Sequence, residues 1–356
     1  MNERVSEESL ELRKREFDEF EGFKTLESFI SAEQHLHPRS RGFFADILRR
    51  IGVASKIIGS RVQRAGLTNV LGKAGRVNIQ GEQQMKLDVM SNELLMNTLQ
   101  WLPAVAGMAS EEEEGVMRLP PHPDEHDTYV IMFDPLDGSS NIDANVSIGT
   151  IFSIHRRVTK WGACEEVDFL QPGRRLLAAG YVIYGSSTMF VYSTGNGVHG
   201  FTLDPEVGEY VLSHPDMRIP DQCRCFSANE TNYKHWDEPT KRFADHIRFG
   251  SDPHYEKTSS RYIGSMVADF HRNLLYGGVF LYPADKKHPT GKLRLLFECA
   301  PLAWLAEQAG GAATTGRQDI LDIQPEKLHQ RCPIVIGNSR EVDLYRQMVA
   351  DHDQGN

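Results

Sequence analysis

A run of five apolar or aromatic residues, Tyr129 to Phe133, is followed at once by the polar segment DPLDGSS, residues 134–140. Such a run bounded by turn residues is typical of a buried strand. A tight turn explains one aspartate, the proline and the glycine, because Asp and Ser side chains bond their own backbone in turns. A second carboxylate, Asp137, repels Asp134 unless a cation lies between them. The segment is therefore either a plain turn or a metal site at the end of a strand.

The metal interpretation also accounts for the residues that follow the two aspartates. Hard carboxylate oxygens suit Mg²⁺ or Mn²⁺, which usually keep water ligands and bridge to substrate phosphates. Gly138 permits a close backbone approach, and the N–H groups of Gly138, Ser139 and Ser140 can hold a phosphate. Metal ligands beside an anion-binding turn are the arrangement that metal-assisted phosphate hydrolysis requires.

Further carboxylates lie at comparable positions. Glu111, followed by Glu112, ends an apolar run as Asp134 does, whereas Glu113 and Glu114 are expected in a solvated loop. Asp88, in KLDVMSN, can equally be a first-turn helix carboxylate or a catalytic one. Glu298, in RLLFECAP, is a charge in an apolar stretch and needs a partner, for which a metal is one candidate.

A basic and aromatic set lies in the second half of the chain. Lysine and arginine supply charge for phosphate recognition, and tyrosine hydroxyls supply direction. Surface cations beside core aromatics explain most of these residues singly, but ADKKHPTGKLR concentrates four cations just before Glu298. The set consists of Arg261, Tyr262, Tyr276, Tyr282, Lys292 and Arg294.

Composition bounds the class of protein. A chain of 356 residues can bury a sizeable core in one large domain or two. Its net charge of −10 argues against nucleic-acid or anionic-membrane partners, and no apolar stretch is long enough to span a bilayer. The N-terminal segment has no apolar signal core, and five cysteines suggest reduced thiols. We therefore expect a cytoplasmic protein.

Strand and helix patterns interleave along the chain, which predicts a mixed α/β protein. Residues 1–24 are expected to be a charged arm, 63–84 a long mobile loop, and 216–221 a domain boundary. A helix capped by Ser91 or Asn92 should stop at Pro103. The other expected helices are 43–62, 265–278 and the later part of 293–311. The expected strands are 104–110, 129–133, 146–154, 176–194, 197–203 and 279–283.

Three segments together resemble class I fructose 1,6-bisphosphatase: FDPLDGSSNID, GEQQMKLDVMSN, and the stretch from RYIGSM to EQAGG, residues 261–311. The segment FDPLDGSSNID alone also fits the wider superfamily of Mg²⁺-dependent, lithium-sensitive phosphatases. The segment 261–311 is more specific and narrows the resemblance to the sugar bisphosphatase. The resemblance covers roughly Phe43 to Gly337. It implies a layered α/β/α/β/α sandwich that assembles as a homotetramer. It also implies hydrolysis of the 1-phosphate of fructose 1,6-bisphosphate by a metal-activated water attacking in line.

The resemblance assigns roles by motif position. The metal ligands for Mg²⁺ (or Mn²⁺), two or more ions per subunit, would be Glu111, Asp134, the carbonyl of Leu136, Asp137 and Glu298. The catalytic carboxylates would be Asp88 and Glu112, with Glu82 on a loop that closes toward the metals. The substrate-binding residues would be Gly138, Ser139, Ser140, Asn229, Arg261, Tyr262, Met266, Tyr282 and Lys292. Arg261 would reach into the neighbouring subunit's site. Residues 25–215 would form a metal-binding and regulatory domain and 216–356 a sugar-phosphate-binding domain.

The sequence departs from the family at its regulatory positions. Animal members bind AMP through small or hydroxyl residues at the start of the first long helix and through a Lys-Tyr pair. Here Thr128 stands at the lysine position, although Tyr129 and Arg156 remain, and Arg41, Phe43 and Ala45 replace the small residues. We expect weak AMP sensitivity. The loop that carries several cysteines in chloroplast members has only Cys164, which excludes a disulfide switch within it.

Three alternatives stay open from the residues alone. A sedoheptulose 1,7-bisphosphatase or a dual enzyme differs by one substrate carbon, and no single residue decides between them. An inositol phosphate or nucleotide phosphatase is a more distant alternative. The segment 261–311 argues against it, because those enzymes have no second phosphate site of this kind. A non-catalytic sugar-phosphate sensor would need the phosphate-binding turn but not the whole carboxylate set. Asn232 and Tyr233 both remain candidates for contacting the 6-phosphate.

Overall fold

The computed structural model describes residues 22–36, 43–67, 72–77, 83–120 and 128–355. The expectations for most of the N-terminal arm, for Arg41 and for Glu82 lie outside these residues. None of the helices within these ranges is both long enough and apolar enough to cross a membrane.

The larger sheet has eight strands in the order β10-β9-β8-β7-β6-β5-β3-β4. β3 and β5 are parallel, whereas β3 and β4 and every successive pair from β5–β6 to β9–β10 are antiparallel. The bounds are β3 Val105–Ser110, β4 Met117–Arg118, β5 Tyr129–Asp137, β6 Ile148–Arg156, β7 Leu176–Tyr184, β8 Thr188–Ser193, β9 Val198–Asp204 and β10 Glu209–Met217. The predicted strands all fall within this sheet except 279–283, and 176–194 is a hairpin.

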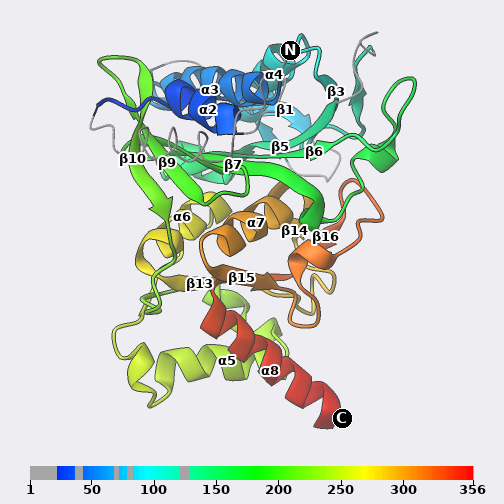
Figure 1. Ribbon diagram of the computed structural model, residues 1–356. Helices are drawn as coiled ribbons and strands as arrows, with labels where there is room; N and C mark the ends of the chain where they lie inside the picture. The colour runs from blue at the N-terminus through cyan, green and yellow to red at the C-terminus, as the bar shows by residue number, and fades with distance from the viewer. Residues whose placement is uncertain (1–21, 37–42, 68–71, 78–82, 121–127, 356) are drawn as a thin grey trace.

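Three helices cover one face of this sheet: α2 (Leu26–Leu36), α3 (Phe43–Val62) and α4 (Lys86–Leu99). Figure 1 shows them above the strands. The amphipathic pattern predicted α3 to the residue, because Ile47, Ile51 and Ile58 repeat at helical spacing and are fully buried. The cluster in which they lie also holds Phe152 and Phe190 of the sheet.

Two predictions in this region are wrong. α4 begins at Lys86, well before Ser91, because the Asp88 carboxylate accepts the N–H of Met85 at 2.8 Å and so caps the first turn. The expected loop over 63–84 contains an antiparallel pair, β1 (Lys73–Val77) and β2 (Gln83–Met85). Gly75, with φ of 74°, lies inside β1 and hides its strand pattern.

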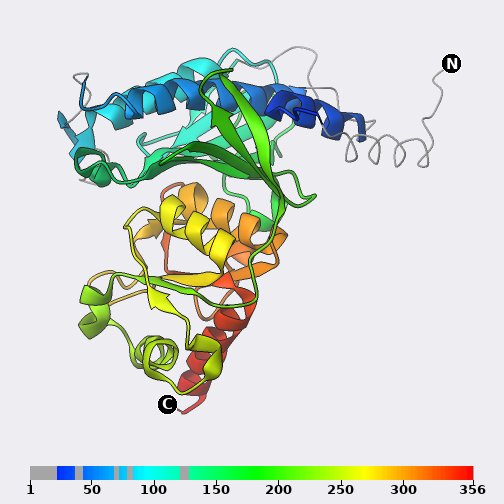
Figure 2. The same ribbon diagram turned by 90° about the vertical axis from the view of Figure 1, so that its left-hand side faces the viewer.

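The second sheet has five strands in the order β12-β11-β13-β17-β15. α6 (Met266–Tyr276) and α7 (Ala300–Gln308) lie between the two sheets, and α5 (Glu238–Phe249) and α8 (Ser339–Gly355) cover the outer face (Figures 1 and 2). The strand bounds are β11 Cys225–Ala228, β12 Ser259–Ser260, β13 Gly278–Tyr282, β15 Gly311–Thr314 and β17 Ile334–Asn338, and β14 Leu293–Arg294 pairs with β16 Arg331–Cys332. The layers run α/β/α/β/α, so the predicted fold class is confirmed.

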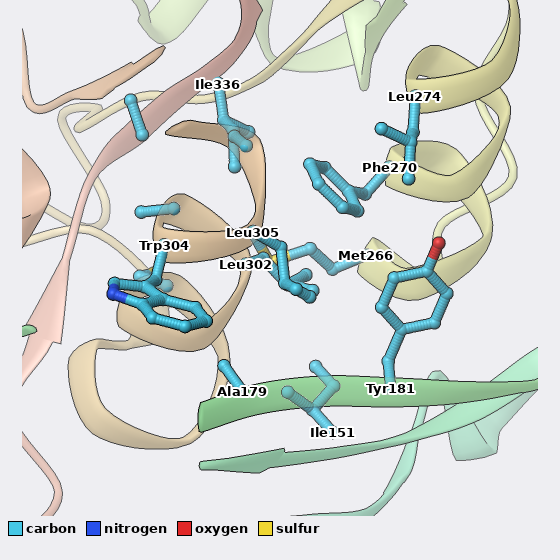
Figure 3. Packing of buried hydrophobic residues seen from close by; sticks show 14 of the residues in the cluster. Ile151, Ala179, Tyr181, Met266, Phe270, Leu274, Leu302, Trp304, Leu305 and Ile336 are labelled. Carbon is cyan, nitrogen blue, oxygen red and sulfur yellow. The ribbon is translucent and has the colours of Figure 1, made fainter. Parts of the chain in front are cut away.

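The middle helical layer is fixed by apolar packing from both sides (Figure 3). Ile151 and Tyr181 of the larger sheet face Met266 and Phe270 of α6, and all four side chains are buried. Burying one such side chain fully stabilises the fold by about 1.5–3 kcal/mol. This packing fixes the first turn of α6 against the underside of the larger sheet.

Candidate active site

Both aspartates of the DPLDGSS segment lie within β5 rather than in a turn. The register with β6 shifts between them, because Asp134 pairs with Ile151 and Asp137 with Gly149. Thr150 donates its hydroxyl to the Pro135 carbonyl at 2.8 Å, which satisfies the backbone at this irregularity. Bulges of this kind re-aim side chains at sites. The plain-turn interpretation therefore fails, and the turn proper begins at Gly138.

The end of β5 contacts the first turn of α6. The Asp137 carboxylate accepts the Ser265 hydroxyl at 2.6 Å and the Val267 N–H at 2.9 Å. A helix N-terminus favours a negative charge, so α6 stabilises this carboxylate. Gly138 has φ of 76°, and a Cβ there would lie 2.6 Å from that of Ser265. Only glycine meets both requirements.

Glu298 comes from the π-helical turn Leu295–Cys299, which leads into α7. Pro301 has no N–H to donate back into this turn. The Arg294 N–H donates to the Glu298 carboxylate at 2.6 Å. π-turns are rare and often occur at functional sites. The turn directs Glu298 toward the end of β5.

Asp134, Asp137 and Glu298 form a buried carboxylate cluster, with one oxygen from each within 4.8 Å of the others. Burial raises the pKa of Asp134 well above its ordinary value, and the charges of Glu111, Asp137 and Glu298 raise it further. Burial likewise raises the pKa of Asp137. Ionising three such groups together is costly unless a cation offsets the repulsion. The hard oxygen donors therefore fit a divalent cation.

Glu111 extends the cluster from the neighbouring strand. β3 runs parallel to β5, and the Glu111 N–H donates to the Phe133 carbonyl at 3.0 Å, beside Asp134. The guanidinium of Arg294, which is buried, pairs with Glu111 and lies 4.0 Å from Glu298. The sequence grouped Arg294 with phosphate-binding cations, but here it joins two carboxylates. It offsets part of their charge.

The pKa of Asp88 lies in the range where a carboxyl group exchanges a proton near neutral pH. Burial, assisted by the charge of Glu112, raises its pKa to about 7. The Met85 N–H and the Ser139 hydroxyl hydrogen-bond to Asp88 and oppose that rise. A carboxylate with a pKa near the working pH suits general base chemistry. Glu112 is half-buried on the adjoining turn, where its N–H donates to the Ser110 hydroxyl at 3.3 Å.

A cavity of about 640 Å³ opens over the cluster. That size is within the usual range for a small-molecule site. It brings together most of the sequence-predicted residues that were to bind phosphate and sugar. Those lining it are Gly138, Ser139, Ser140, Tyr262, Met266, Tyr282 and Lys292, with Asp137, Arg294 and Glu298.

Two predicted substrate residues do not line the cavity. The Asn229 side chain caps the short helix Glu230–His235 by accepting from Thr231. The exposed Arg261 donates to the Ser260 carbonyl at 3.1 Å.

Leu136 is buried between the two aspartates, and its N–H donates to Asp134 at 2.9 Å.

The hydroxyl of Tyr233 donates to Asp245 at 2.7 Å, so this residue is engaged on α5. In the region compared with the AMP site, the Tyr129 ring contacts Phe44, with ring centroids 5.5 Å apart, and the Arg156 guanidinium. Ala45 and Thr128 are buried. All cysteines, Cys164 included, are buried and unpaired.

Sequence reasoning missed several residues that hold the site together. Ser265 precedes an apolar helical run, and this N-cap signal could have identified it. Glu113 is exposed, yet its carboxylate accepts from Asn92 at 2.7 Å. The Glu113 carbonyl lies 2.8 Å from Nε2 of His329. No local pattern connects position 329 with position 113.

The chain is similar to known proteins along most of its length. Residues 24–215 match the family model "Fructose-1-6-bisphosphatase, N-terminal domain", and residues 219–350 match its C-terminal counterpart. A class 1 fructose-1,6-bisphosphatase of Nitratidesulfovibrio vulgaris is 49% identical over 92% of this chain and 98% of its own length. The cytosolic fructose-1,6-bisphosphatase of Arabidopsis thaliana is 48% identical over 93% and 96%.

Solved structures of the Leishmania major enzyme are also similar to this chain. Its holo form superposes with a TM-score of 0.85 at 41% identity, covering 92% of this chain and 99% of the other. Its T-state gives a TM-score of 0.81 at 40% identity over the same shares. The chain belongs to the fructose-1,6-bisphosphatase family, as its motifs indicated.

Proposed function

We propose that this chain hydrolyses the 1-phosphate of fructose 1,6-bisphosphate to give fructose 6-phosphate and inorganic phosphate. One observation carries the proposal: a single cavity is lined by carboxylates of the buried cluster, by the Gly138 turn, and by Lys292 with two tyrosines. A substrate with two phosphates needs both a reacting site and a second anion site. Its relatives carry this activity in their names.

The 1-phosphate binds at the turn that follows β5. There the N–H groups of Gly138, Ser139 and Ser140 supply hydrogen-bond donors without a side-chain charge. Asp88 accepts the proton of the attacking water, because a pKa of about 7 leaves much of it ionised at neutral pH. Glu112 assists in orienting that water, and Glu82 is the third carboxylate that we assign to the catalytic step.

The residues assigned to Mg²⁺, with Mn²⁺ as a substitute, are Glu111, Asp134, the Leu136 carbonyl, Asp137 and Glu298. Two or more ions per subunit match this number of carboxylates. When bound, the ions stabilise negative charge on the transferred phosphoryl group. This assignment is supported by the cluster itself, whose carboxylates repel one another and offer the hard oxygen donors that a divalent cation prefers.

The 6-phosphate and the sugar bind through Lys292, Tyr262 and Tyr282, with the backbone near Met266, all of which line the cavity. Asn229 and Asn232 are further candidates on the adjoining short helix. Residues 25–215 then act as the metal-binding and regulatory domain and 216–356 as the sugar-phosphate domain. We further propose a cytoplasmic homotetramer in which the exposed Arg261 completes a neighbour's site.

The test is phosphate release with Mg²⁺ from fructose 1,6-bisphosphate and, separately, from sedoheptulose 1,7-bisphosphate, each with and without AMP. The proposal predicts a strong preference for the fructose substrate and weak AMP inhibition. Comparable rates on both substrates would identify a dual bisphosphatase. No release from either substrate would overturn the proposal in favour of a non-catalytic sensor.

A further inference from the structure

The acidic turn at residues 111–114 is held from the C-terminal half of the chain by His329. Nε2 of His329 lies 2.8 Å from the Glu113 carbonyl oxygen. Because a carbonyl oxygen can only accept, the ring donates through Nε2. Burial lowers the pKa of His329, which favours the neutral ring that makes this bond.

The same ring packs on the segment that carries Glu298. The rings of His329 and Phe297 have centroids 5.1 Å apart and planes tilted by 34°. Phe297 is fully buried and directly precedes Glu298. His329 therefore touches the two carboxylate-bearing segments at once, one through a hydrogen bond and the other through its ring face.

The loop around His329 is itself anchored on both sides. Leu328 is buried in a cluster with Phe297 and with Ala109 of β3. The carbonyl of Gln330 accepts the N–H of Leu295 at 2.7 Å, at the start of the π-helical turn. A short, anchored segment fixes a side chain more tightly than a free loop does.

A second contact, from α4, also holds the acidic turn. Asn92 of α4, which is buried, donates its amide to the Glu113 carboxylate at 2.7 Å. Asp88 lies one helical turn earlier on α4. Glu113 thus receives one bond from the helix of Asp88 and one from the loop of His329.

We propose that His329 is a positioning residue, which holds the turn bearing Glu111 and Glu112 against the π-helical turn bearing Glu298. This inference rests on the proposed function, since it concerns the geometry of the same carboxylates. Groups that orient metal ligands typically change metal affinity or activity by about 10- to 100-fold when removed. His329 neither lines the cavity nor belongs to the carboxylate cluster, so its effect is transmitted through the two turns.

The test compares His329→Phe, which keeps a ring against Phe297 but loses the donor, with His329→Gln, whose amide nitrogen can take the place of Nε2. Lys327→Ala, an exposed change in the same loop, is the control. Each protein is titrated with Mn²⁺ by electron paramagnetic resonance, and kcat and KM are measured with fructose 1,6-bisphosphate and Mg²⁺.

His329→Phe should weaken Mn²⁺ binding and lower kcat by about 10-fold or more, with KM changed by less than about twofold. His329→Gln should recover most of the loss, and Lys327→Ala should match the wild type. Wild-type Mn²⁺ affinity in His329→Phe, or a His329→Gln variant as impaired as His329→Phe, would overturn the inference. A wild type that binds Mn²⁺ but releases no phosphate would refute the proposed activity instead, and the Mn²⁺ titrations would still decide the role of His329.

A double-mutant cycle gives a second test that needs no turnover. If Asn92 and His329 hold the same turn, the effects of Asn92→Ala and His329→Phe on Mn²⁺ affinity should not add. Strictly additive effects would contradict a shared role. Circular dichroism of each variant establishes that it is folded before the titration is interpreted.

Discussion

The hydroxyl of Ser265 donates to the Asp137 carboxylate at 2.6 Å, a contact between residues 128 positions apart. Ser265 caps α6 of the middle layer, and Asp137 ends β5 of the larger sheet. One member of the carboxylate cluster is therefore held by the helix that packs under the sheet. The site forms only when the two parts of the chain are docked.

Ser265→Ala should lower both stability and metal affinity. The change leaves a buried carboxylate with one donor fewer, which typically costs about 1–3 kcal/mol in the free energy of unfolding. Urea denaturation and Mn²⁺ titration would measure the two effects. Ser260→Ala, whose hydroxyl contacts the more exposed Glu230, is the control and should change little. Equal stabilities for the two variants would contradict the structural role of this contact.

Gly138→Ala should be more damaging than an equivalent change elsewhere. Gly208 has nearly the same φ, 77° against 76°, but a Cβ there meets none of the described residues within 4 Å. Gly208→Ala should therefore cost only the left-handed strain, about 1–2 kcal/mol. Gly138→Ala should cost more and should also lose phosphate release, because its Cβ displaces Ser265. Thermal unfolding and activity should be measured for both alanine variants, since only Gly138→Ala adds a steric clash to the backbone strain. Similar losses in the two variants would contradict a close approach between Gly138 and Ser265.

In the metal-free protein, ionisation of Asp88 should lower the free energy of unfolding progressively as the pH rises. Its pKa is about 7 in the folded state against an ordinary 3.8, so the folded form binds its proton more tightly. The unfolded form ionises first, and stability falls between about pH 4 and pH 7. The free energy of unfolding of Asp88→Asn, relative to the wild type in chelator, should rise across this window. The exposed Asp351→Asn serves as the control, and a flat difference for Asp88→Asn would contradict the burial argument.

Helices and strands were predictable wherever a periodic or continuous run of apolar residues marks the buried face of the element. The burial period of α3 and the apolar run of β5 were visible in the residues, and the interleaving of strands and helices gave the mixed class. α4 was misplaced because its first turn is capped by Asp88 from inside the helix, whereas Ser91 looked like the cap. β1 was missed because Gly75 interrupts its alternating strand pattern.

The clustered carboxylates were also predictable, because Asp134 ends an apolar run, Asp137 follows three residues later, and Glu298 interrupts another apolar stretch. What the sequence could not supply is which distant groups contact them. Arg294 appeared to be a phosphate ligand because it stands among lysines, yet its burial pairs it with Glu111. His329 carried no signal at all, because its role depends on a loop that packs against a turn more than two hundred residues earlier.

The most direct test of the account is phosphate release from fructose 1,6-bisphosphate with Mg²⁺ by the wild type and by Asp134→Asn. Asn keeps the shape of the side chain but removes a charge from the cluster, so the fold should persist. Turnover should fall by about 100-fold or more. The control is Glu256→Gln, an exposed change away from the cluster, which should leave the rate unaltered. A folded Asp134→Asn variant with a near-normal rate would contradict the claim that this buried cluster holds the catalytic metal.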